Sequence, residues 1–168
     1  MKGYFGTHCD SIDLCVRNDV VCYNGECLEG VCICTDGFEG EDCSVESRLR
    51  YLGEYYMVEG CEKLDTFNNV YLRIESDPFD PALMQLVNLC NYNQFPTNGF
   101  FSSITARPIA GTDNFNIPYQ KPDGENTDKS IEGSGTITVI DSVTTIDISY
   151  TITRGTKMYS CTVSAQKI

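Results

Sequence analysis

From residue 51 to the end of the chain, apolar and polar side chains alternate along short stretches. In residues 143–152, Ile146, Ile148, Tyr150 and Ile152 occupy every second position. A period-two stripe is typical of a strand with one buried face. We predict about eight such strands, each bounded by turn-forming residues, over residues 51–62, 67–75, 83–92, 100–106, 114–119, 133–140, 143–152 and 157–165.

The breaks between these stretches indicate how the strands connect. Two Asp-Pro steps, Asp77-Pro78 and Asp80-Pro81, must interrupt strand pairing because proline has no backbone N–H. No stretch has a capped 3.6-residue stripe, so we expect little helix. The pattern predicts a mainly β protein whose antiparallel strands close into a barrel, because closure removes exposed edges. A sandwich of two sheets is the alternative, since periodicity does not separate the two.

The cysteines indicate a different kind of structure for the first part of the chain. Seven of the ten lie in the first 43 residues, a density typical of proteins from oxidising compartments. Their spacing is not the C-x2-C spacing of structural zinc sites. We therefore expect disulfides and no bound metal.

The charge balance excludes some partners. The net charge is −12, and residues 1–45 carry nine acidic side chains but only two basic ones. Binding to nucleic acid or to an anionic membrane surface needs clustered Lys and Arg, so we expect neither. Residues 1–9 lack the apolar run of a signal peptide, and we expect that the sequence starts after a removed leader or at an added methionine.

Six cysteines form one ordered string: Cys15, Cys22, Cys27, Cys32, Cys34 and Cys43. The last part contains Gly37, Phe38 and Gly40 in the order C-x-C-x2-G-F-x-G-x2-C, and residues 22–27 read C-Y-N-G-E-C. This string resembles an EGF-like module. Spacing alone leaves fifteen pairings for six cysteines.

The resemblance implies the disulfides Cys15–Cys27, Cys22–Cys32 and Cys34–Cys43. They would substitute for a core that so short a module cannot build. The chain then divides into a tail (1–14), an EGF-like module (15–43), a linker (44–50) and a β-barrel or sandwich domain (51–168). Of the acidic pattern that binds calcium in many such modules only Asp13 is present, so we expect no calcium site.

The order of the parts resembles a second group of proteins. Residues 43–61 are similar to bacterial surface lipoproteins in which an EGF-like module runs directly into a strand. Weaker similarity continues through residues 117–120, a predicted turn at 133–135, and residues 148–150 and 159–161. The resemblance implies a cell-surface location and anchoring at the outer membrane through a lipid or a partner. Cys9 lacks the small residues that precede a lipidated cysteine.

Four cysteines remain outside the string. Cys61 and Cys161 would be neighbours if the barrel closes, and Cys61 with Cys90 is the alternative. Cys9 and Cys90 are then left to pair with each other, to stay free or to link molecules. Ser11 and Ser142 lie in short Asp-Ser-aliphatic strings that resemble O-glycan acceptors of bacterial surface proteins.

Catalytic chemistry has few candidates. The only histidine, His8, lies in the tail, which excludes the usual histidine-dependent nucleophilic sites. No glycine-rich phosphate loop is present. We expect no catalytic residue, no cofactor and a non-enzymatic protein.

The leading hypothesis is an extracellular or cell-surface interaction module that binds a protein partner or itself through the β domain, with the first module as a spacer. Tyr51, Tyr55, Tyr56 and Tyr71 are its candidate surface, although half-buried core positions are the commoner place for such tyrosines. A structural subunit of an extracellular filament is the alternative. A carrier or inhibitor with a small apolar ligand in the barrel is the third hypothesis.

Overall fold

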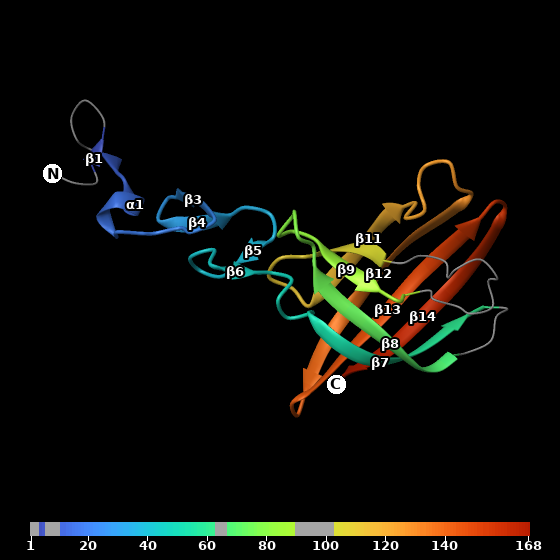
Figure 1. The fold of residues 1–168 in the computed structure, drawn as a ribbon. Helices are drawn as coiled ribbons and strands as arrows, with labels where there is room; N and C mark the ends of the chain where they lie inside the picture. Colours follow the sequence, from blue (N-terminus) through green and yellow to red (C-terminus); the bar gives the residue numbers. More distant parts are fainter. Residues whose placement is uncertain (1–3, 6–10, 63–66, 90–102) are drawn as a thin grey trace.

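A computed structural model describes residues 4–5, 11–62, 67–89 and 103–168 of the chain. Figure 1 shows a small N-terminal module that projects from one end of a barrel. The elements are β1 (Tyr4–Phe5), β2 (Ser11–Ile12), α1 (Leu14–Arg17), β3 (Gly25–Leu28), β4 (Val31–Cys34), β5 (Phe38–Glu39), β6 (Val45–Glu46), β7 (Gly53–Cys61), β8 (Phe67–Ser76), β9 (Met84–Val87), β10 (Ser103–Pro108), β11 (Asn114–Gln120), β12 (Lys129–Ile140), β13 (Val143–Arg154) and β14 (Lys157–Lys167).

The predicted closed barrel is confirmed. Eight antiparallel strands pair in the order β10-β11-β12-β13-β14-β7-β8-β9, and β9 pairs back onto β10. The longest pairing joins β12 to β13, from Lys129 opposite Arg154 to Ile140 opposite Val143. A two-sheet sandwich is therefore not the arrangement. No helix in the described ranges is long and apolar enough to cross a membrane.

Two predicted boundaries are wrong. The strand predicted at residues 83–92 is shorter, because β9 ends at Val87 and Asn88 has a positive φ of 72°. The turn predicted at residues 133–135 lies inside β12. Glycine is needed there because a neighbouring side chain packs against the strand: a Cβ on Gly135 would lie 2.2 Å from Cζ of Phe115.

Inward-facing side chains fill the barrel. In β13 every second residue from Ile146 to Ile152 is buried: Ile146, Ile148, Tyr150 and Ile152. These side chains form one hydrophobic cluster with those of the other barrel strands. Each side chain of the cluster is at most 7% exposed. In the described part of the chain the lumen is therefore a packed core.

Two tyrosines lie within this core beside the N-terminal module. The Tyr51 hydroxyl donates to the backbone oxygen of Asn114 at 2.9 Å, and its ring meets that of Phe115 edge-on. The Tyr55 hydroxyl donates to the Tyr51 backbone oxygen at 2.6 Å. Both side chains are fully buried, and this desolvation raises the pKa of each to about 12.

The N-terminal module consists of short two-stranded sheets. β3 pairs with β4, and β5 pairs with β6. β6 lies in the predicted linker at 44–50, so this segment is structured rather than a plain connection. The short helix α1 was not expected. It begins after Asp13, whose carboxylate accepts the backbone N–H groups of Cys15 and Val16.

Candidate interaction surface of the disulfide-rich module

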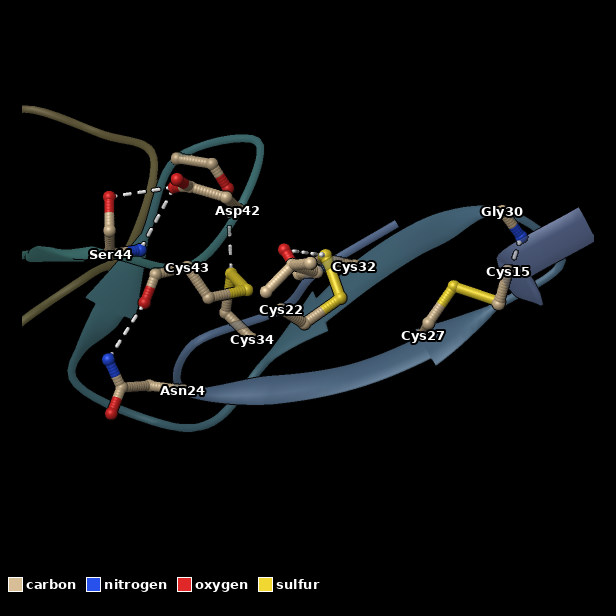
Figure 2. The surroundings of a disulfide bond; sticks show 12 residues. Cys15, Cys22, Asn24, Cys27, Gly30, Cys32, Cys34, Asp42, Cys43 and Ser44 are labelled. Atoms are coloured by element: carbon tan, nitrogen blue, oxygen red, sulfur yellow. Dashed lines mark hydrogen bonds between the residues drawn. A yellow bond between two sulfur atoms is a disulfide. The ribbon is translucent and has the colours of Figure 1, made fainter. Parts of the chain in front are cut away.

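Three disulfides hold the N-terminal module together. They join Cys15 to Cys27, Cys22 to Cys32 and Cys34 to Cys43, and Figure 2 shows them spaced along the β3–β4 hairpin. These are the pairings implied by the resemblance to EGF-like modules. They use one face of the hairpin, where Cys27 and Cys32 lie opposite each other.

The other face of this hairpin is apolar and uncovered. Strand alternation turns Leu28, Val31 and Ile33 away from the disulfides, and their exposed fractions are 63%, 63% and 55%. Leu28 lies opposite Val31, and Ile33 lies opposite Glu26. We call these four residues the hairpin face. Exposed aliphatic side chains that lie together mark a candidate contact surface, because scattered single apolar residues are the norm on protein surfaces.

The surroundings of the hairpin face are acidic. Residues 11–45 carry eight acidic side chains and one basic one, Arg17. Five of these side chains are exposed: Asp19, Glu26, Glu29, Asp36 and Glu41. A surface of this kind combines an apolar contact area with a negative field that attracts cations.

Arg48 fastens the module to the barrel. Its Nη1 donates to the backbone oxygens of Asp77, Asp80 and Leu83 at 2.8, 3.0 and 3.0 Å, and its Nε donates to Glu46 at 2.8 Å. The side chain is almost fully buried. One guanidinium therefore ties β6 to the β8–β9 loop.

A second set of contacts joins the module to the β10–β11 loop. Arg50 pairs with Glu39 and also donates to the Thr112 backbone oxygen at 3.0 Å. Glu39 accepts the backbone N–H of Gly111 at 2.8 Å, and Asp36 of the module pairs with Arg107 of β10. Together with Arg48 these contacts form what we call the joint.

Close backbone approach completes the joint. Gly37 has a φ of +90°, and a Cβ there would lie 2.6 Å from the Ala82 nitrogen. The Gly37 oxygen also accepts the Ser47 N–H at 2.9 Å. Only glycine combines this φ with this contact. The module is therefore held at a defined angle, with β3 and β4 on the far side of β5 and β6 from the barrel (Figure 1).

The barrel contributes its own disulfide and one buried polar pair. Cys61 of β7 and Cys161 of β14 are bonded, which was the first choice among the pairings left open by the sequence. Near them, Tyr150 donates to the buried carboxylate of Glu59 inside the barrel. Among the described residues, no group of three or more His, Cys, Asp or Glu could hold a metal ion.

The tyrosines named as a candidate surface separate into two pairs. Tyr51 and Tyr55 are core residues, whereas Tyr56 and Tyr71 lie side by side on the outside of the barrel. Asp13 caps α1. His8, Cys9 and Cys90 lie outside the described residues.

The two serines in the glycan-like strings differ in what the structure describes. Ser142 is exposed in the tight turn between β12 and β13, where Asp141 and Ser142 both have positive φ values. Ser11 lies in β2.

Neither the hairpin face nor the joint was predicted from the sequence. Val31 and Ile33 alternate with Cys32 and Cys34, so the pattern that places the cysteines inward also places these aliphatic residues outward. Arg48 had no recognisable signal, because its three acceptors are carbonyls that come together only in the folded β8–β9 loop.

Comparison with known proteins gives no assignment. No protein-family model matches the chain, and none of the curated proteins matches it.

Proposed function

We propose that this chain is a non-enzymatic, secreted or cell-surface binding protein whose hairpin face docks a protein partner with apolar and basic side chains. The single observation that carries this proposal is the apolar hairpin face of Leu28, Val31 and Ile33. Covering the exposed part of each of these side chains contributes about 1–2 kcal/mol before the cost of association is subtracted.

The charge around the hairpin face supports a basic partner. Residues 11–45 have five exposed carboxylates and one basic residue, Arg17, and only Asp36 of the five pairs with an arginine of the barrel, Arg107. A partner segment that places Lys or Arg beside apolar residues would pack against the aliphatic side chains and be attracted by the carboxylates. Association would then be fastest at low ionic strength, because salt screens the exposed charges.

The barrel acts as the support for this surface. Its described lumen is packed, which gives little room for the small apolar ligand of the carrier hypothesis. Its strands close into a barrel, which removes most of the exposed strand edge that a filament would use for strand addition. The joint fixes the direction in which the hairpin face points.

Four disulfides indicate an oxidising environment. A secreted or cell-surface location agrees with this. An EGF-like identity of the first module agrees with the three pairings, and such modules are common in extracellular proteins. O-glycosylation at the exposed Ser142 and anchoring at an outer membrane belong to the same proposal.

Site-specific photo-crosslinking tests the proposed function. A photoreactive residue is placed at Val31 of the full chain and, as a matched control, at Val139 of the barrel, which is equally exposed at 65%. The labelled proteins are applied to intact cells of the source organism. We expect a discrete adduct with another protein from position 31, none from position 139, and a lower yield as ionic strength rises.

Competition identifies the surface responsible. Excess unlabelled protein should abolish the adduct, whereas the Leu28→Ser/Ile33→Ser variant should compete poorly. Equal labelling from positions 31 and 139, or full competition by the double variant, would overturn the proposal. Adducts between two copies of this chain would instead favour the structural subunit.

A further inference from the structure

Tyr56 and Tyr71 form a matched pair on the outer surface of the barrel. They lie directly opposite each other in the antiparallel pairing of β7 with β8, two strands that run side by side in Figure 1. Their hydroxyl oxygens are 2.7 Å apart and hydrogen bonded. The ring centroids are 4.6 Å apart with an interplanar angle of 42°. Both side chains remain about half exposed.

We propose that Tyr56 and Tyr71 are a site of oxidative cross-linking, at which a one-electron oxidant joins the two rings into an intrachain dityrosine. The oxidant class is a haem peroxidase acting with hydrogen peroxide. This proposal is independent of the partner proposed for the hairpin face.

The coupling removes two electrons and two protons from the pair of phenols. Each phenol loses one electron and its hydroxyl proton and becomes a neutral phenoxyl radical. The two radicals form one carbon–carbon bond between ring carbons adjacent to the hydroxyl-bearing carbons. Each of these carbons then loses its hydrogen as a proton while the phenol oxygen regains one. Overall two protons and two electrons leave, and they reduce one hydrogen peroxide to two waters.

The geometry favours this coupling over reaction between molecules. The coupling carbons are direct neighbours of the carbons that carry the hydroxyl groups, and the hydroxyl groups already touch. The two strands hold the rings in register, which converts a bimolecular encounter into a unimolecular step. The hydrogen bond between the two hydroxyl groups raises the pKa of Tyr71, so at neutral pH Tyr71 enters as a protonated phenol.

Other tyrosines supply contrasts. Tyr51 and Tyr55 are fully buried and have no access to an enzyme oxidant. Tyr23 and Tyr119 are more exposed than the pair, at 69% and 62%. If exposure alone decided the reaction, Tyr23 and Tyr119 would react first and would join separate molecules.

The cross-link would complete a chain of covalent links around β7. The Cys61–Cys161 disulfide already fastens β7 to β14 on one side. A Tyr56–Tyr71 bond would fasten β7 to β8 on the other. Both links need oxidising conditions, which the four disulfides already indicate.

Peroxidase treatment of the dilute full-length protein tests the proposal. We expect dityrosine fluorescence in the monomer and a loss of two hydrogen masses. After reduction of the disulfides and tryptic digestion, peptide 51–63 should be joined to peptide 64–73, in which Tyr71 is the only tyrosine. Either Tyr56→Phe or Tyr71→Phe should lower the monomer signal by about tenfold or more, because the positioned partner is lost.

Tyr23→Phe and Tyr119→Phe are the matched controls and should leave the monomer signal within about twofold, since neither belongs to the positioned pair. Fluorescence confined to dimers, or a peptide map that joins other tyrosines, would overturn the proposal. So would an unchanged monomer signal in Tyr56→Phe. The wild-type peptide map decides the question even if a variant folds poorly.

Discussion

Cys61 and Cys161 lie directly opposite each other in the β7–β14 pairing, and their disulfide joins positions 100 residues apart in the sequence. This bond closes the longest loop of the four disulfides, whereas those of the N-terminal module span 9 to 12 residues. Loop-closure entropy rises with loop length, so this one link restricts the unfolded barrel more than any of the other three.

Removing this disulfide should destabilise the barrel strongly. The Cys61→Ala/Cys161→Ala variant is expected to lose about 3–5 kcal/mol of unfolding free energy, the range for a loop of this length. Urea unfolding followed by far-UV circular dichroism measures the loss. The Cys22→Ala/Cys32→Ala variant is the control and should leave the barrel transition nearly unchanged. A loss below about 1 kcal/mol in the first variant would contradict the entropic argument.

Arg48→Met should loosen the joint. The change removes a donor from three backbone carbonyls of the β8–β9 loop, of which the Asp80 and Leu83 oxygens keep the backbone N–H groups of Leu83 and Asp77. The Asp77 oxygen loses its Arg48 donor, and one unsatisfied buried group costs about 1–3 kcal/mol, so we expect a loss of about 2 kcal/mol. Hydrogen exchange at Leu83 and Ser47 reports the opening. Arg73→Met, which breaks an exposed ion pair with Glu75, should cost less than about 1 kcal/mol.

Gly135→Ala tests the packing of Phe115. The added methyl group would lie 2.2 Å from the Phe115 ring, and such overpacking costs about 1–3 kcal/mol. The cost should shrink in a Phe115→Leu background, where the smaller side chain makes room, and a double-mutant cycle measures this coupling. The neighbouring Ser134→Ala, on the solvent side of β12, should change the unfolding free energy by less than about 0.5 kcal/mol. Equal costs for Gly135→Ala in both backgrounds would argue against a clash with this ring.

Alkaline pH should unfold the barrel through Tyr51 and Tyr55. Their folded pKa values are raised from 10.0 to about 12 by burial. A raised folded pKa contributes stability that is fully present below pH 10 and is lost as pH rises through 12. Each pKa unit is worth about 1.4 kcal/mol, so the two tyrosines together dominate this window. Tyrosinate absorbance and circular dichroism should change together there. In Tyr55→Phe the loss of stability over this window should be smaller, whereas Tyr119→Phe should match the parent protein.

The repeating side-chain pattern made most of the barrel predictable. Ile146, Ile148 and Ile152 face inward as the period-two stripe indicates. A strand with one buried face needs an apolar residue at every second position, and this pattern is visible in the sequence alone. The Cys61–Cys161 bond followed once closure was assumed. The turn predicted at Gly133 and Gly135 was wrong, because these glycines make room for neighbouring strands: Gly133 for Ser149 and Tyr150 of β13, and Gly135 for the Phe115 ring of β11. The joint was not predicted because the acceptors of Arg48 are backbone carbonyls, which every residue type carries, so the sequence does not identify them.

The joint also determines how the molecule carries force. A force applied to the β3–β4 hairpin is transmitted through the Cys34–Cys43 disulfide, so the residues between these two cysteines cannot extend. It then reaches Arg48 and Arg50, whose bonds to two different loops stretch together and share the load. We therefore expect the segment between the hairpin and the barrel to extend little under tension, because the disulfide and the contacts of both arginines would have to break first.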